Sequence, residues 1–323
     1  MLPDFTFVSI TYNHERFILQ HLESIKYQVR NYGNKIKIDL LICDDASNDD
    51  TVLVAKHWVE RNKAFFNDVR IIRNEKNAGT VSNVCNAYKM VRTDNFKLLA
   101  GDDLFFKNNI FEIAGKADIV ISPTAYFNDA YISRVTRHEI PMYVYMYLDT
   151  LNHGNSKALS TNITYNNYID APGVFLNKKV ISDGLIEYIS KYRFIEDFPS
   201  WYYLLVEKCN DYSISITPKP YVLYRYESGI SFSGKNKHSF FEDELYRLRK
   251  DLKLKLFRYP KWINPYTYYF KAKHTIQKKQ ASKIMHNDFG WMNDEGFAEE
   301  ANGYLRMIYK KADEEYRESL GRS

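Results

Sequence analysis

One short stretch constrains the fold of this chain more than any other: an apolar run that stops at a glycine and two adjacent carboxylates. The run Phe-Lys-Leu-Leu-Ala at 96–100 predicts a short buried strand. Gly101 permits a sharp turn, so Asp102 and Asp103 are expected at the carboxyl edge of a sheet, where open α/β sheets bind ligands. Adjacent carboxylates suit Mg²⁺ or Mn²⁺. Taken alone, however, a Gly-Asp-Asp is more often a solvated acidic turn.

Three further predicted strands also end at a polar side chain. The strands alternate with amphipathic helices at the spacing of right-handed βαβ crossovers, which predicts an α/β fold with a mostly parallel sheet flanked by helices. Because the carboxyl ends of parallel strands share one edge, four polar strand exits in succession favour a ligand site over an ordinary turn. The strands are predicted at 5–10, 36–43, 69–72 and 96–100, with a fifth at 119–121, and the polar residues after the first four are Asn13, Asp45, Asn77 and Asp103.

Composition and missing motifs exclude several other classes of protein. The chain has 323 residues, of which 45% are hydrophobic, and its net charge of +5 is too small to indicate a nucleic-acid partner. No Gly-x-Gly-x-x-Gly follows the first strand and no P-loop is present, which argues against a dinucleotide cofactor and against P-loop chemistry. A nucleotide bound at this edge would therefore be held by carboxylates, asparagines and a metal ion.

The spacing of the cysteines and the hydropathy of the chain indicate the cellular compartment of the protein. The three cysteines are far apart, which fits neither a zinc site nor a disulfide framework and predicts a reducing environment. The N-terminus begins with a strand pattern, and no apolar run reaches the ~20 residues that span a bilayer. We therefore expect a cytoplasmic protein with neither a signal peptide nor a transmembrane helix.

Four motifs together resemble the nucleotide-sugar-binding half of a family 2 glycosyltransferase with the GT-A fold, of the type that builds bacterial surface polysaccharides such as capsules. Each motif is weak alone, but their order and spacing within residues 1–122 are typical of that family. The motifs are Ser-Ile-Thr-Tyr-Asn at 9–13 with Glu15, Ile-Cys-Asp-Asp-Ala-Ser-Asn-Asp-Asp-Thr at 42–51, Asn-Ala-Gly at 77–79 with Asn83, and Gly-Asp-Asp at 101–103.

The resemblance implies a nucleotide-sugar donor, in particular a UDP-sugar, and a role for each motif. Asp45 would read the edge of the base, and Asp102 would lie near the ribose. Asp103, with Asp102 beside it, would bind a Mn²⁺ or Mg²⁺ ion that bridges the diphosphate. The nucleotide pocket would be lined by Thr11, Tyr12 and Asn13 with Glu15, and the sugar-phosphate would be flanked by Asn77, Gly79 and Asn83.

In the second half, the most informative feature is a pair of acids between apolar residues, Glu196 and Asp197. An acid in apolar surroundings has a raised pKa, which suits a general base, but negative charge at a helix N-terminus explains the pair equally well. The family usually has a Glu-Asp pair here whose Asp serves as the base, and this resemblance favours Asp197. In related enzymes a cationic segment after the next strand closes over the diphosphate, and Arg225, before a Gly/Ser-rich predicted lid at 228–235, is the candidate.

We therefore expect a GT-A domain at 1–240 and a C-terminal helical region at 241–323. The first comprises a nucleotide-sugar-binding half at 1–122 and an acceptor half at 123–240. Between residues 250 and 283, ten Lys and Arg stand against one acid, interleaved with seven large aromatic residues. That mixture fits an anionic membrane surface, but also single-stranded nucleic acid or a solvated basic helix. An acidic amphipathic helix at 296–320 would fold back or mediate self-association.

These features predict an inverting, metal-dependent glycosyltransferase that adds one sugar to a hydroxyl of a glycan or lipid-linked acceptor, at the inner face of the cell membrane. Single addition is expected because the Gln-x-x-Arg-Trp segment of processive members is absent. Two alternatives stay open. A nucleotidyltransferase that makes nucleotide sugars is disfavoured because residues 11–15 contain no glycine, and a non-catalytic sugar-binding module would not need both Asp103 and Asp197.

Overall fold

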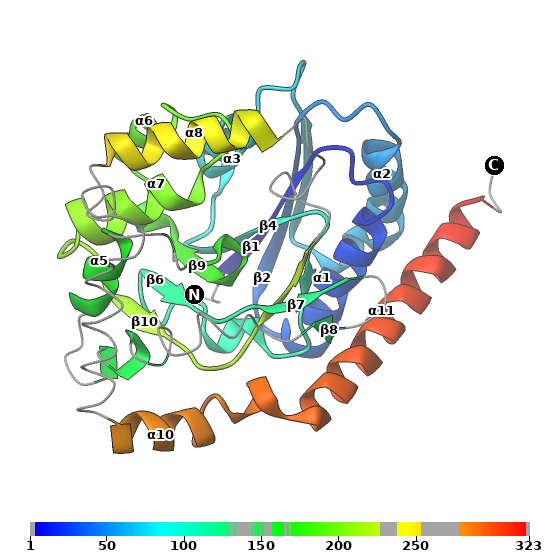
Figure 1. The fold of residues 1–323 in the computed structure, drawn as a ribbon. Helices are drawn as coiled ribbons and strands as arrows, with labels where there is room; N and C mark the ends of the chain where they lie inside the picture. The colour runs from blue at the N-terminus through cyan, green and yellow to red at the C-terminus, as the bar shows by residue number, and fades with distance from the viewer. Residues whose placement is uncertain are drawn as a thin grey trace.

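A seven-stranded sheet forms the centre of this computed structural model (Figure 1). The strand order is β10-β6-β9-β4-β1-β2-β3, and β9 runs antiparallel to both of its neighbours while the other pairs are parallel. The predicted α/β fold with a mostly parallel sheet is therefore confirmed. In chain order the strands are β1 (Asp4–Thr11), β2 (Lys37–Asp44), β3 (Asp68–Arg73), β4 (Asn95–Ala100), β6 (Ile119–Ile121), β9 (Val174–Asn177) and β10 (Ile214–Ile216).

The structure describes most, but not all, of the chain. The Gly/Ser-rich segment at 228–235 lies outside the described residues, and so does 253–277, which is most of the basic-aromatic region. The structure describes residues 4–128, 132–133, 144, 146–148, 150–151, 157–164, 167, 169–226, 238–252 and 278–320.

Alternating side chains of the central strands build two apolar layers, one on each face of the sheet. Phe5 and Phe7 of β1 pack on the face covered by α1 (Ile18–Tyr32) and α2 (Thr51–Asn62). Val8 and Ile10 pack on the opposite face. Figure 1 shows α1 and α2 on one side of the sheet and the second group of helices on the other. That second group is α3 (Thr80–Met90), α5 (Lys157–Ile163), α6 (Asp183–Ile189), α7 (Asp197–Tyr202) and α8 (His238–Asp251).

A second, smaller sheet packs against the last helix of the chain. The strands β5 (Leu104–Phe105), β11 (Val222–Arg225), β7 (Ala125–Phe127) and β8 (Ile132–Ser133) form this sheet in that order. The last helix, α11 (Glu295–Leu320), packs its apolar face against these strands and runs along α1 (Figure 1). The amphipathic helix predicted at 296–320 is confirmed, and it folds back onto the central domain.

The described C-terminal region is helical, as expected, and consists of α8, α10 (Lys278–Asn287) and α11. Ion pairs tie the far end of α11 to the first half, since Lys26 Nζ lies 2.9 Å and Arg61 Nη2 3.3 Å from the Glu315 carboxylate. Within the part of the chain that the structure describes, no helix is both long and apolar enough to cross a bilayer.

Candidate active site

The loops after β1 and β2 are bound to each other at the carboxyl edge of the sheet. Asn13 adopts a left-handed backbone conformation with φ 56°, and its N–H donates to Ser47 Oγ at 2.8 Å. Its side-chain oxygen in turn accepts the N–H of Asn48 at 2.8 Å. Asn is one of the few residues other than Gly that adopts this conformation readily. The two strand exits therefore form one ordered edge, as the parallel topology predicts.

The other residues expected to line the nucleotide pocket divide between the interior and the rim. Thr11 is buried, and its hydroxyl donates to Asp44 Oδ2 at 3.0 Å. Tyr12 is 36% exposed, so its ring is accessible at this edge. Glu15 is exposed, and its carboxylate accepts the N–H of Asp50 at 3.3 Å. Of these positions, Tyr12 and Glu15 are the ones a ligand can reach.

Asp45 orders the loop that follows β3. Its buried carboxylate accepts N–H groups from Asn74 Nδ2 at 2.8 Å, Ala78 at 3.0 Å and Gly79 at 2.8 Å. Gly79 is needed in this loop because its φ is 94° and an added Cβ would lie 2.7 Å from the Arg193 carbonyl oxygen. The exits of β2 and β3 are thus joined through one carboxylate.

The two asparagines expected near the sugar-phosphate are placed differently. Asn77 is exposed at the loop tip. Asn83 is 3% exposed, and its Nδ2 donates to the Cys43 carbonyl at 2.9 Å, which ties α3 to β2. Asn77 therefore remains accessible to a ligand, whereas the amide of Asn83 supports the sheet beneath.

The Asp102–Asp103 pair lies at the exit of β4 and is held from several sides. Asp103 Oδ1 accepts the backbone N–H of Arg225 at 2.8 Å. Burial, followed by the charge of Asp102, raises the pKa of Asp103 well above its usual range. Burial lowers the pKa of His21 to about 4, so this imidazole is neutral, and its Nδ1 donates to the Asp103 carbonyl at 2.8 Å. His14 Nε2 lies 3.9 Å from the Asp102 carboxylate.

This carboxylate pair fits a divalent cation. Positive charge is favourable beside a carboxylate whose pKa is raised by desolvation and by a neighbouring carboxylate. Mg²⁺ is commonly held by one or two carboxylates, with water and phosphate oxygens filling the other positions. No three His, Cys, Asp or Glu side chains among the described residues converge as a closed metal cage. The pair therefore suits an open metal site whose other positions are filled by water or by oxygens of a bound ligand.

Arg225, the residue expected to close over a diphosphate, has its guanidinium in the interior of the protein. The side chain is 2% exposed and lies between two aromatic rings, 4.4 Å from the centroid of Phe17 and 4.4 Å from that of Phe127. Its Nε donates to the Asp102 carbonyl at 2.9 Å and its Nη2 to Gln20 Oε1 at 2.6 Å. Through these contacts the guanidinium holds the backbone of the carboxylate pair.

Lys97 is a buried cation that sequence reasoning missed. Its Nζ donates to the carbonyls of Leu98 at 2.7 Å and Ala171 at 3.3 Å, and it lies 5.3 Å from the centroid of the Phe175 ring. Burial lowers the pKa of Lys97 to about 7, while the Asp103 carboxylate acts in the opposite direction. A signal was present in the sequence: a lone Lys inside an apolar strand, if buried, must find such partners.

Asp197 begins α7 and keeps part of its surface exposed. Its Oδ2 accepts Asn167 Nδ2 at 2.7 Å and its Oδ1 accepts the N–H of Phe198 at 2.6 Å. Desolvation raises the pKa of Asp197 to about 6 and also raises the pKa of Glu196. The two interpretations of this residue, helix N-terminus and acid with a raised pKa, are therefore both correct descriptions of the same position.

A further carboxylate, Asp170, stands near Asp197 on the side expected to receive the acceptor. It accepts hydrogen bonds from the Thr124 hydroxyl at 2.6 Å and the Tyr126 hydroxyl at 2.8 Å. Desolvation raises its pKa, and its charge contributes to the raised pKa of Asp197. The next residue, Ala171, accepts the Lys97 bond, so β4 and the acceptor side are directly linked.

A comparison with models of known protein families identifies the family of this chain. Residues 6–184 match the model of the family described as Glycosyl transferase family 2. Because the match covers more than half of the 323 residues, this chain belongs to the family 2 glycosyltransferases. No curated protein matches the chain.

Solved structures of S. aureus TarS share the fold. One has a TM-score of 0.51 and 17% identity, and the match covers 98% of this chain and 54% of TarS. A structure of TarS 1–349 has a TM-score of 0.50 and 16% identity, covering 98% of this chain and 90% of that one. The same fragment in complex with UDP-GlcNAc has a TM-score of 0.49 and 15% identity, with the same coverage.

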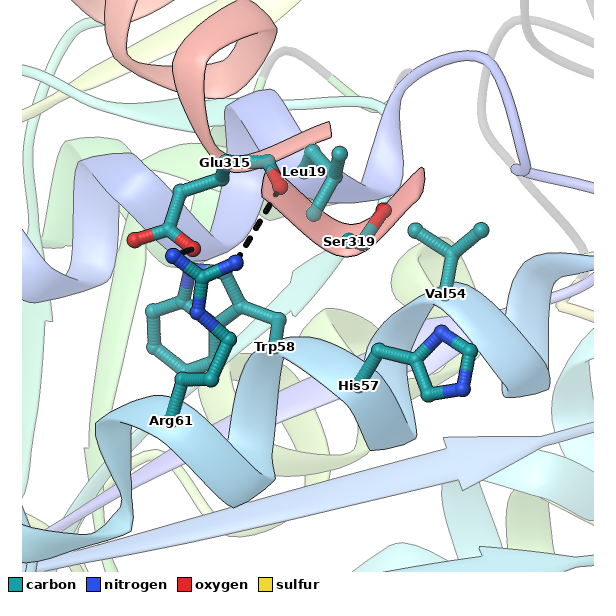
Figure 2. A pocket seen from close by; sticks show the side chains of 7 residues that line it. All are labelled: Leu19, Val54, His57, Trp58, Arg61, Glu315 and Ser319. Carbon is teal, nitrogen blue, oxygen red and sulfur yellow. Dashed lines mark hydrogen bonds and ion pairs between the residues drawn. The ribbon is translucent and has the colours of Figure 1, made fainter. Parts of the chain in front are cut away.

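A small hollow lies between α2, α1 and the end of α11 (Figure 2). Its walls include His57, Trp58 and Arg61 of α2, with Glu315 of α11 accepting a hydrogen bond from Arg61 through its carbonyl at 3.4 Å. The volume is about 10 Å³, which is room for about one water molecule. The hollow is a packing gap under α11, too small for a nucleotide or a sugar.

Proposed function

We propose that this protein is an inverting glycosyltransferase that transfers one sugar from a nucleotide-sugar donor, in particular a UDP-sugar, to a hydroxyl of a glycan or lipid-linked acceptor of a surface polysaccharide. One observation carries the proposal: a family 2 chain presents two separate acidic centres. The Asp102–Asp103 pair follows β4, and Asp197, with its raised pKa, begins α7. A donor site needs the first, and deprotonation of an acceptor needs the second.

Asp197 would act as the general base. The acceptor proton would pass to its carboxylate while the hydroxyl oxygen bonds to the anomeric carbon and the bond from that carbon to the diphosphate breaks. Attack from the face opposite the leaving group inverts the configuration. A pKa of about 6 leaves the carboxylate mostly ionised at neutral pH yet more basic than an ordinary Asp. The Asn167 amide and the Phe198 N–H would hold it in position.

The donor would lie along the exits of β1, β2, β3 and β4. The exposed Tyr12 ring offers a stacking surface for the base, and Asp45, whose N–H donates to the Thr11 carbonyl at 2.9 Å, follows β2. Asn77 and Gly79 would flank the sugar-phosphate. Asp102 and Asp103 would hold Mn²⁺ or Mg²⁺, which when bound neutralises charge on the leaving diphosphate. His21 and Arg225 would keep both aspartate backbones in place without touching the donor.

The test is a panel of UDP- and other nucleotide sugars, with UDP-GlcNAc first. Release of the nucleoside diphosphate into water is measured with Mn²⁺, Mg²⁺ or EDTA, and thermal stabilisation is followed in parallel. We expect one donor to be hydrolysed slowly in the presence of metal, with an anomeric product of inverted configuration. Pyrophosphate release from a nucleoside triphosphate and a sugar phosphate would instead support a nucleotidyltransferase. Stabilisation by free sugars, without any hydrolysis, would support a binding module.

The region at 250–283 carries a second, separable part of the proposal. From its sequence we propose that it rests on an anionic membrane surface and brings the site to a lipid-linked acceptor, because each basic residue there contributes roughly 1 kcal/mol near such a surface. Co-sedimentation with liposomes should require anionic lipid and weaken in high salt. Changing Lys271, Lys273, Lys278 and Lys279 to Glu should release the protein while donor hydrolysis continues. If the wild-type protein does not bind anionic liposomes at low salt, the membrane part of the proposal is wrong and the glycosyltransferase part is unaffected.

A further inference from the structure

A buried carboxylate on α8 accepts hydrogen bonds from the backbone just before Asp197. The Glu244 side chain is about 7% exposed, and its residue lies in the middle of α8. Its Oε2 accepts the N–H of Arg193 at 2.8 Å, and its Oε1 accepts those of Phe194 at 2.7 Å and Ile195 at 2.9 Å. Three consecutive backbone N–H groups thus converge on one side chain that lies about fifty positions later in the chain.

The segment bound by Glu244 lies between the two halves of the candidate site. On one side, the Arg193 carbonyl accepts the N–H of Val81 at 3.1 Å, at the start of α3. An added Cβ on Gly79 would lie 2.7 Å from that same carbonyl, so the donor-side loop and this segment are in close contact. On the other side, the chain continues within two residues to Asp197. The bound segment therefore contacts the donor-side loop and leads directly into the proposed base.

The bonding at Glu244 is strong because it is charge-assisted. Hydrogen bonds between an ionised carboxylate and backbone N–H groups are roughly twice as strong as neutral ones. Arg247, one turn further along α8, lies 3.7 Å from Oε2 and donates to the Lys191 carbonyl at 3.1 Å, which anchors the same turn. Loss of the carboxylate would leave partly buried N–H groups unpaired, whereas the rest of α8 would keep its apolar contacts through Leu248.

We propose that Glu244 is a positioning residue that fixes the 193–195 segment and thereby sets Asp197 against the acceptor. This inference rests on the proposed function only for the role of Asp197. It also assigns α8 to the catalytic unit, although the sequence suggested a boundary near residue 240. Glu244 is nearly buried and bonds to backbone N–H groups just before Asp197, so its effect should be on turnover and not on donor affinity.

The experiment compares Glu244→Gln and Glu244→Leu with the matched control Asp243→Asn, an exposed carboxylate next to it on α8. Amide hydrogen exchange of the peptide spanning residues 191–197 is measured in the free, full-length protein, together with KM and kcat for hydrolysis of the UDP-sugar donor. The leucine variant should exchange faster in that peptide alone and lose about 10²-fold in kcat, because a misplacement of about 1 Å at the reacting groups costs that much. The donor KM should change less than twofold.

The glutamine variant should recover part of the loss, because its remaining oxygen can still accept the bonds of Phe194 and Ile195. The control should match the wild type. Unchanged exchange in residues 191–197 for both Glu244 variants would overturn the proposal, and so would a loss expressed in donor KM with kcat intact. If the leucine variant does not fold, the same exchange and kinetic measurements on the glutamine variant decide whether the proposal holds. Should the wild type hydrolyse no donor, the proposed function fails, and the exchange data still decide whether Glu244 holds this segment.

Discussion

Arg225 Nε donates to the backbone carbonyl of Asp102 at 2.9 Å, and the N–H of Arg225 donates to Asp103 Oδ1 at 2.8 Å. One residue of β11 thus holds both members of the carboxylate pair that follows β4. The guanidinium is enclosed by two aromatic rings and also bonds to Gln20 of α1. Its positive charge stabilises the turn that carries the two carboxylates of the proposed metal site.

The first prediction concerns Arg225. Arg225→Met should lower the free energy of unfolding by about 2–4 kcal/mol, since it removes the bonds that the guanidinium donates to the Asp102 carbonyl and to the Gln20 amide oxygen. Arg225→Lys should recover less than half of this, because one ammonium cannot reproduce two separate bonds and ring stacking. Urea unfolding measures the stability, and donor-induced thermal shifts measure the site. Full stability with donor binding reduced would instead give Arg225 the diphosphate role first expected of it.

The second prediction concerns Asp103 and the metal. The folded-state pKa of Asp103 lies above its unfolded value, so this carboxyl costs stability as pH rises through the unfolded value and the cost persists at neutral pH. Asp103→Asn should therefore make the metal-free protein more stable at pH 7, while activity falls by orders of magnitude. It should also abolish the thermal shift that Mn²⁺ with UDP gives the wild type.

EDTA should reproduce the loss of activity in the wild type, because several kcal/mol of leaving-group stabilisation depend on the cation. Asp102→Asn serves as the companion variant at the other carboxylate. A metal-independent wild type, or an Asp103→Asn protein that still shows the Mn²⁺ shift, would assign Asp103 a purely structural role.

Much of this arrangement follows from local sequence pattern. The strands and the helix α3 were predictable because alternation and a 3.6-residue period report which face is buried. The convergence of Asn13, Asp45 and Asp103 was predictable because parallel strands share a carboxyl edge. The roles of Asp102, Asp103 and Asp197 as ligands and base came from the family resemblance and remain proposals.

The contacts that support the site could not be predicted in the same way. Arg225 was assigned to the diphosphate, yet the residues that enclose it, Phe17 and Phe127, come from distant parts of the chain. Glu244 carries no local signal either, because an acidic residue on a helix is usually solvated and its partners lie about fifty positions earlier. Long-range polar contacts of this kind depend on tertiary packing, which no local periodicity reports.

The third prediction concerns α11. Ile308 is fully buried in the cluster that α11 shares with Leu104, the residue after Asp103, and with Leu223, two residues before Arg225. Ile308→Ala should cost about 2–4 kcal/mol of unfolding free energy through lost burial and a cavity. It should weaken donor binding as well, because Ile308 belongs to the cluster that holds Leu104, the residue directly after Asp103. Arg306→Ala, an exposed position on the same helix, is the control and should change neither. Equal effects of the two variants would show that α11 is an appendage with no bearing on the site.

The last prediction concerns the pH dependence of turnover. Desolvation raises the pKa of Asp197 to about 6, and a general base acts in its deprotonated form. Turnover of donor hydrolysis should therefore be low below pH 5, rise with pH through about 6 and level off above pH 7.

Asn167→Ala removes a hydrogen bond that favours the carboxylate form, so it should move this rise to higher pH. Asp197→Asn should retain donor affinity, lose about 10²–10⁴-fold in turnover and abolish the rise. An unshifted profile in Asn167→Ala, or a rise that persists in Asp197→Asn, would show that another group titrates, and Asp170 would be the next residue to change.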